Sequence, residues 1–360
     1  MNREINNKLE KLQNIYRSNG AKGILINKQK NISWLLRGRS HVGFFSEDGV
    51  CSLLLNENGL HLLVNNIESR RLPSEEFPEE TLVIIEYPWY KEDTRLKLAG
   101  ELTGENYITD GQVEDLLKPL RLKFSPGEIE DYRYLGQDAG AVLEEVCFSV
   151  KPGMTEFAIA SLLAQKSVER GLEPNVILTA ADERIYLYRH PLPTNRVVEK
   201  YVMLVLVARK HGLMVSLTRF VSFTALPGEL KKKQFHLSKI NTELISHTRP
   251  GKTTGEVFVF LRQKYAEAGY PDEWKLHHQG GIIGYSPREY KITSQIDIQI
   301  EAGNAYAWNP SITGFKAEDT YLIRENNNEL LTLTPNLPSV EMKENNQKVK
   351  TAGILVRTIY

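Results

Sequence analysis

Hydrophobic and polar residues alternate at helical and strand spacing along the first third of the chain. Leu9, Leu12 and Tyr16 share one face of a helix predicted in the segment NNKLEKLQNIYRSNG, which ends at Gly20. Four short apolar segments follow between Gly, Asn and Glu turns and predict strands: KGILIN, GVCSLLLN, GLHLLVN and ETLVIIEYP. This mixture of elements predicts a compact α/β domain over residues 1–122.

A second unit begins with a helix-start signal in the segment SPGEIEDYR. Ser125 is the predicted N-cap, Pro126 takes the first helical position, and Glu128 completes a capping box. Apolar residues then recur at helical spacing for several turns. We therefore place a second domain over residues 123–345 and treat residues 346–360 as a C-terminal tail.

The second domain contains an internal duplication. Residues 150–172 align without a gap on residues 248–270, with identical Pro, Gly, Thr, Leu, Gln, Lys, Glu and Gly residues at equivalent positions. Each copy has a Pro-Gly turn, a threonine N-cap (Thr155 or Thr253), an amphipathic helix and a terminal glycine. Strand-like sequence follows each copy. The repeat predicts two halves related by pseudo-twofold symmetry, with a ligand cleft between their sheets.

Composition narrows the classes of partner. The chain has 360 residues, of which 41% are hydrophobic and 25% charged, and Lys+Arg and Asp+Glu both total 45. This balance gives no electrostatic reason to expect nucleic acid or an anionic membrane as partner. Cys51 and Cys147 are the two cysteines, so neither a disulfide scaffold nor a thiolate metal site is expected. The N-terminal segment lacks an apolar signal core and no apolar run is long enough for a membrane span, so a cytoplasmic protein is expected.

Six segments carry a resemblance to a known family: FSPGEIEDYR, VKPGMTE, RHPLPTNRVVEK, HGLMVSLTR, HHQGGIIGY and KAEDTYLI. The duplicated unit resembles the pita-bread domain of creatinase, aminopeptidase P and prolidase, the M24 peptidases, and the first unit resembles their accessory domain. The resemblance implies an α/β (α+β) fold, in which a creatinase/prolidase-type α/β domain precedes a pseudo-twofold pita-bread domain. It also implies a homodimer, by analogy alone.

The resemblance further implies a site for two divalent ions, held in active family members by two Asp, one His and two Glu. Such ions acidify a bridging water so that it attacks an amide. The aligned positions in this sequence are Val205, Ser216, Gly281, Asn309 and Glu318. Four of the five are replaced by groups that bind hard cations poorly. We therefore expect no metal ligands of this kind, no cofactor and no stoichiometric transition metal.

Other residues of the predicted cleft carry candidate chemistry. Creatinase cleaves a C–N bond without metal through a histidine that aligns with His190, so His190 and Glu318 are the predicted catalytic residues. Glu318 without metal needs an Arg, a His or a cationic ligand as partner. The predicted substrate-binding residues are His277, His278, Arg288, Glu289, Asn309 and Ser216.

Each assignment has a structural alternative. His277 or His278 packs in the sheet, His190 caps a loop, and Arg288 with Glu289 forms a surface ion pair. The resemblance also leads us to interpret Arg219 as structural rather than catalytic.

Three functions remain open from the sequence. The first is a metal-independent hydrolase, or related lyase, that acts on a C–N bond of a small amidino, amide or imino-acid compound. The second is a pseudo-peptidase that binds a small molecule or short peptide without turnover. The third is a proline-specific metalloaminopeptidase with an altered metal set. His190 and Glu318 favour the enzyme, and the replaced ligands favour the binding module.

Overall fold

The computed structural model describes residues 3–77, 82–344 and 347–358. The chain divides into two compact units, Met1–Arg121 and Leu122–Tyr360. Of the helices in the described part, none is long and apolar enough to cross a bilayer.

The first unit is a five-stranded mixed sheet with helices, in the strand order β4-β3-β2-β1-β5. The four apolar segments form its first four strands; residues 80–81, the start of the fourth segment, lie outside the described part of the chain. Strands β1 and β2 pair antiparallel, whereas β3 and β4 pair parallel. The elements are α1 (Arg3–Ser18), β1 (Gly23–Lys28), α2 (Gln29–Leu36), β2 (Asp48–Asn56), β3 (Gly59–Asn65), β4 (Val83–Tyr87), α3 (Thr94–Thr103), β5 (Ile108–Thr109) and α4 (Glu114–Leu117).

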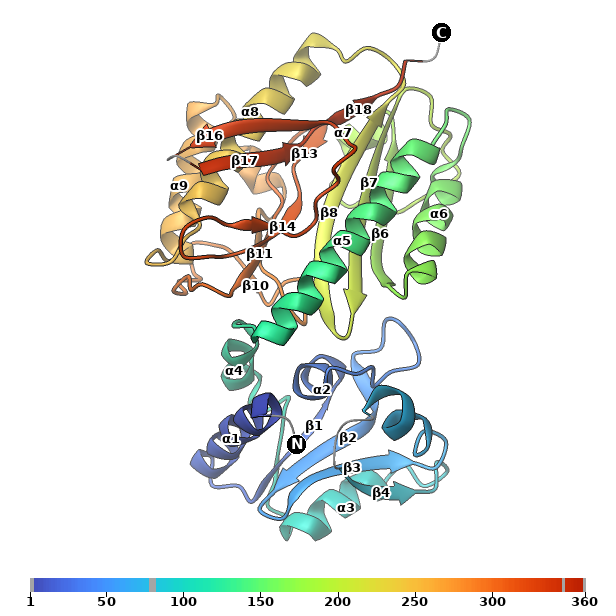
Figure 1. Ribbon diagram of the computed structural model, residues 1–360, viewed down its shortest axis with the longest axis vertical. Helices are drawn as coiled ribbons and strands as arrows, with labels where there is room; N and C mark the ends of the chain where they lie inside the picture. Colours follow the sequence, from blue (N-terminus) through green and yellow to red (C-terminus); the bar gives the residue numbers. More distant parts are fainter. Residues whose placement is uncertain (1–2, 78–81, 345–346, 359–360) are drawn as a thin grey trace. The chain divides into compact units, whose positions relative to one another are not determined.

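The second unit begins with the predicted long helix. Ser125 caps α5 (Pro126–Ser149), and the reciprocal hydrogen bonds with Glu128 form the expected capping box. The other helices are α6 (Glu156–Glu169), α7 (Arg184–Leu187), α8 (Gly228–His247) and α9 (Thr254–Glu267). Helix α5 packs on β7 and β8, and α6 packs on β6 (Figure 1).

Two main sheets and two small hairpins complete this unit. One sheet has the order β18-β8-β7-β6 and the other the order β10-β9-β11-β14-β15. The strands are β6 (Glu173–Ala181), β7 (Tyr201–Lys210), β8 (Leu213–Ser222), β9 (Gly280–Ile282), β10 (Tyr290–Lys291), β11 (Ala305–Trp308), β12 (Ser311–Ile312), β13 (Phe315–Lys316), β14 (Asp319–Leu322), β15 (Glu329–Leu330), β16 (Ser339–Glu344), β17 (Gln347–Ala352) and β18 (Ile354–Val356).

The duplicated segments adopt the same local structure. Helices α6 and α9 both have 14 residues, and the side chains of Thr155 and Thr253 cap them as predicted. Each threonine also forms an isolated β-bridge, with Val197 in the first half and with Gln299 in the second. The repeat in the sequence is therefore a structural repeat of cap, helix and isolated β-bridge.

The two sheets meet along β8 and β14. The Thr218 amide donates to the carbonyl of Glu318 at 3.1 Å, and the Ser216 amide donates to Oγ1 of Thr320 at 2.9 Å. Behind this line Arg219, 2% exposed, pairs with buried Asp319 at 2.8 Å, consistent with a structural role. Residues far apart in the sequence are thus held beside one another.

Much of the segment that we predicted to be a C-terminal tail, residues 346–360, instead forms two strands of the second unit, β17 and β18. Within residues 347–356, β17 pairs with β16, and β18 lies parallel to β8 with Ile354 opposite Phe220. Arg357 then donates to the carbonyls of Phe148 and Val150, at 2.7 and 2.8 Å, at the end of α5. Val349 and Ile354 are buried, because the apolar residues of this segment face the core.

Candidate functional site

A cavity of about 330 Å³ lies in the second unit, where β6, β7 and β8 face the second sheet. One wall is apolar, formed by Val176, Leu178, Val205 and Val207 on β6 and β7. The rest of the lining is mostly polar. Its residues are His190, Ser216, His278, Pro287, Arg288, Lys291, Asn309, Lys316 and Glu318. Six of the predicted site residues therefore line one cavity: His190, Ser216, His278, Arg288, Asn309 and Glu318.

Two predicted residues lie elsewhere. His277 lines a small neighbouring cavity of about 20 Å³ and contacts His190. Glu289 is buried, 4% exposed, and lies outside the lining of both cavities. The predicted substrate-binding role of Glu289 therefore gains no support from its position.

Glu318 is held by two cationic side chains. Arg288 donates to its Oε1 at 3.2 Å, and the Lys316 ammonium lies 2.8 Å from Oε2. The hydroxyl of Thr218 also donates to Oε2, at 2.6 Å. Burial by itself raises the pKa of Glu318, but the charges of Lys316 and Arg288 outweigh it and lower the pKa to about 2. Glu318 is thus an ionised carboxylate whose oxygens are already engaged.

The charges around the cavity do not balance. Arg288, Lys291 and Lys316 supply three positive charges to its lining, and Glu318 supplies the single carboxylate. Arg288 and Lys316 are largely buried, with side chains 8% and 9% exposed. A positive excess in a partly desolvated cavity attracts an anion.

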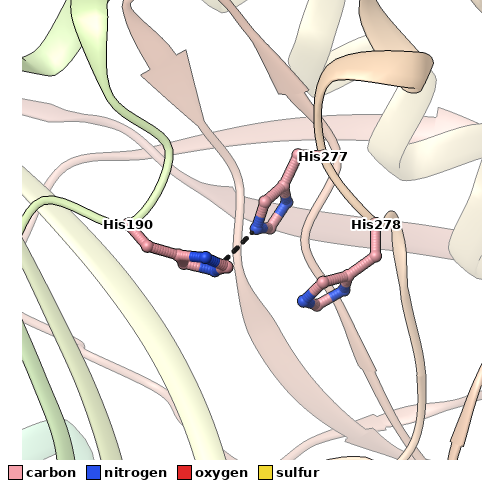
Figure 2. A group of neighbouring side chains, drawn as sticks. All are labelled: His190, His277 and His278. Atoms are coloured by element: carbon pink, nitrogen blue, oxygen red, sulfur yellow. Dashed lines mark hydrogen bonds between the residues drawn. The ribbon is translucent and has the colours of Figure 1, made fainter.

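Three imidazoles gather beside one another in the second unit (Figure 2), and two of them, His190 and His278, line the cavity. Nε2 of His190 lies 3.0 Å from Nε2 of His277, and the rings of His277 and His278 stack with centroids 4.3 Å apart. Burial lowers the pKa of His277 to about 2 and that of His278 to about 3. Burial, with the charge of Lys316, also lowers the pKa of His190. All three rings are therefore neutral at pH 7.

Two neutral polar side chains, Ser216 and Asn309, lie on the cavity wall. Ser216 accepts a hydrogen bond from Arg288 at 3.1 Å. Buried Asn309, 2% exposed, has an amide oxygen that meets no hydrogen-bond donor among the described residues. An unpaired buried amide oxygen is costly, so a ligand with an N–H or O–H group gains by pairing with it.

Sequence reasoning missed Lys316, Lys291 and Thr218. Lys316 stands two residues before Glu318, the spacing that puts side chains on one face of an extended segment. That signal was available. Thr218 has no such signal, because its contact depends on how β8 lies beside β14.

Comparison with known proteins identifies the family. Residues 130–325, more than half of the chain, match the metallopeptidase family M24. An uncharacterised peptidase of Staphylococcus epidermidis is 30% identical over 256 residues, which cover 67% of this chain and 71% of that protein. The chain belongs to the M24 family. The resemblance seen in the sequence is confirmed.

Other relatives extend the likeness of this M24 chain. An uncharacterised peptidase of Staphylococcus saprophyticus is 25% identical over 233 residues, which span 62% of this chain and 66% of that protein. The crystal structure of the prolidase from Pyrococcus horikoshii superposes with a TM-score of 0.76 and 18% identity, covering 91% of this chain and 98% of that one. The predicted pita-bread fold with a preceding α/β domain is confirmed.

The residues of this M24 chain do not fit the dinuclear metal set that the family implies. Val205, Ser216 and Asn309 line the cavity and offer no charged ligand. At Gly281 a side chain is sterically excluded, because a Cβ would overlap the carbonyl oxygen of Tyr290. Lys316 and Arg288 already occupy both oxygens of Glu318. Cationic side chains thus stand around the one carboxylate that remains.

Proposed function

We propose that this M24 protein binds a small organic anion, a carboxylate with an apolar group, without the two-ion chemistry of its family. The observation that carries the proposal is the positive excess of Arg288, Lys291 and Lys316 over Glu318 in one cavity. A ligand carboxylate relieves that excess through charge-assisted hydrogen bonds. The apolar wall of valine and leucine residues accommodates the rest of the ligand.

An imino-acid compound or a short peptide with a terminal carboxylate fits this description. Relatives from Pyrococcus furiosus and Pyrococcus horikoshii are named Xaa-Pro dipeptidases. A proline-like ring with its carboxylate has the apolar and anionic parts that the cavity favours. A cationic amidino compound fits worse, because Lys316 and Arg288 repel it and Glu318 is already paired.

Charge discrimination tests the binding proposal. N-acetyl-L-proline should bind more tightly than N-acetyl-L-prolinamide, its uncharged analogue, by calorimetry or thermal shift. The Lys316→Met variant should lose about 10- to 100-fold of the affinity for the carboxylate, the usual worth of a hydrogen bond to a charged group. The exposed Lys232 on α8 provides the matched control, and Lys232→Met should bind as the wild type does. Equal binding of the two compounds, or no binding at millimolar concentration, contradicts the proposal.

Turnover separates the two roles for the cleft. His190 lines the cavity and is neutral, so it can accept a proton, which supports metal-independent hydrolysis as a second candidate. Nε2 of His190 faces Nε2 of His277, however, and within the described residues no carboxylate hydrogen-bonds the His190 ring to orient it. We therefore expect metal-free protein to bind glycyl-L-proline and leave it intact in product analysis. Cleavage that disappears in His190→Ala would instead favour the hydrolase.

The assembly state is a separate proposal. The homodimer expected from the family resemblance stays a prediction, as does a cytoplasmic location. Light scattering at micromolar concentration should give the mass of two chains, and the mass of a single 41.1 kDa chain would contradict the dimer.

A further inference from the structure

Three of the chain's eight histidines meet in the second unit. His190 comes from the segment between α7 and β7, and His277 and His278 come from the segment before β9. One ring nitrogen from each residue lies within 4.8 Å of the other two. Figure 2 shows the three rings converging from the two segments. The arrangement brings three nitrogen donors to one point.

The hydrogen bonding of these rings leaves lone pairs unused. The two Nε2 atoms of His190 and His277 share at most one proton between them at their separation of 3.0 Å. Nδ1 of His277 and Nδ1 of His278 are buried and have no hydrogen-bond partner within the described residues. His277 is buried, with 8% of its surface exposed. Each neutral imidazole carries one nitrogen lone pair, and the hydrogen bond between His190 and His277 uses one of the three, so the cluster has nitrogen lone pairs to offer an ion.

We propose that His190, His277 and His278 hold one divalent transition-metal ion, of the zinc class. Imidazole nitrogens suit Zn²⁺, Co²⁺, Ni²⁺ and Cu²⁺, whereas Mg²⁺ and Ca²⁺ require oxygen ligands. Three histidines leave a fourth position of a tetrahedral ion open. None of the three residues occupies a position of the family's dinuclear set, so this centre is distinct from the one that the sequence has lost.

The geometry requires a small adjustment. Ligand nitrogens about 2.0–2.1 Å from a tetrahedral zinc lie roughly 3.3 Å from one another. The pair His190–His277 is already near this spacing, and the full set lies within 4.8 Å. His190 is exposed, so its side chain can rotate toward the other two rings.

The neighbouring charges decide what completes the site. Lys316, Arg288 and Lys291 face the histidines and oppose the entry of a dication, while Glu318 favours it. An ion that enters together with an anion avoids most of this repulsion. The open position is therefore taken by hydroxide or a carboxylate that also meets Lys316 or Arg288. This metal centre goes beyond the proposed carboxylate binding. It makes His190 a metal-coordinating residue and not the general acid–base residue of a metal-independent hydrolase.

Cobalt titration of the chelator-treated full chain tests the centre. Co²⁺ should bind at one per chain with visible absorption bands of a low-coordinate site, and Zn²⁺ should displace it. The variants His190→Gln and His278→Gln should each weaken Co²⁺ binding by more than about 100-fold, since even residues behind the ligands cost 10- to 100-fold. The matched control is His236→Gln on α8, whose ring packs on Tyr270 away from the cluster and whose loss should leave the affinity unchanged.

The outcomes are distinct. Circular dichroism of each metal-free variant checks that the fold persists; both mutated rings are accessible enough for glutamine to replace them. Wild-type affinity in both histidine variants, or no cobalt bands at millimolar Co²⁺, overturns the proposal. Two ions per chain that are lost in Glu318→Gln overturn it as well, and would restore the family's centre. One cobalt ion bound without any binding of N-acetyl-L-proline supports the centre and refutes the proposed ligand class.

Discussion

Arg219→Ala is expected to destabilise the second unit by about 3–5 kcal/mol, the usual cost of removing one partner from a buried ion pair. Arg219 and Asp319 have side chains that are each 2% exposed and lie 2.8 Å apart. The guanidinium also donates to Oγ1 of Thr334 and to the carbonyls of Thr218 and Thr332. Burial raises the pKa of Asp319, and Arg219 opposes that rise. Truncation removes the cation that pairs with the buried carboxylate of Asp319 and the guanidinium donor of the other acceptors.

Urea unfolding resolved by hydrogen exchange measures this loss, because it separates the transition of the second unit from that of the first. The exposed pair Lys123–Glu301, with side chains 67% and 58% exposed and 3.2 Å apart, supplies the control. Lys123→Met should change stability by less than about 1 kcal/mol, as exposed pairs do. Similar effects of the two substitutions would show that the Arg219 network contributes little.

Gly281→Ala is expected to destabilise the same unit by about 3 kcal/mol, at the upper end of the cost of overpacking. Gly281 has φ of 155°, and β9 lies between β10 and β11. A methyl group at this position overlaps the carbonyl oxygen of Tyr290, whose residue pairs with Ile282 in the ladder. Neither backbone can move without breaking hydrogen bonds of the sheet.

Gly228→Ala is the matched control, because no atom lies within 4 Å of a Cβ at this first residue of α8. Its effect should stay below about 1 kcal/mol and can be stabilising. A mild effect of Gly281→Ala, measured in the same urea experiment, would mean that β9 adapts. In that case a histidine at residue 281 could rebuild part of the family's metal set.

Local signals predicted the elements well. The capping box at Ser125 and the threonine caps at Thr155 and Thr253 depend on residues within three positions of each other, so the sequence contains the whole interaction. His190, Arg288 and Glu318 were predicted to share a cavity for a different reason. The family resemblance implies a known fold, and that fold determines which distant residues lie together. The partner expected for Glu318 was found in Arg288.

Long-range contacts could not be predicted in this way. The contact between His190 and His277 joins residues 87 positions apart, and no local sequence pattern around either residue predicts it. Thr218 reaches Glu318 across two strands 100 positions apart. The sequence also led us to treat residues 346–360 as a tail, since the partner of β18 lies far away in β8. Register between distant strands is set by packing, which one sequence does not display.

The parallel pairing of β18 with β8 has a consequence for how the protein is made. The chain leaves the ribosome N-terminal end first during synthesis, so β6, β7 and β8 emerge long before Ile354–Val356. Until Ile354–Val356 emerge, the end of β8 at residues 220–222 lacks the strand that pairs with it there. An open, apolar strand edge is a template for association with other chains. We therefore expect nascent chains to expose this end of β8 until β18 docks, and to associate more readily with other chains before that step.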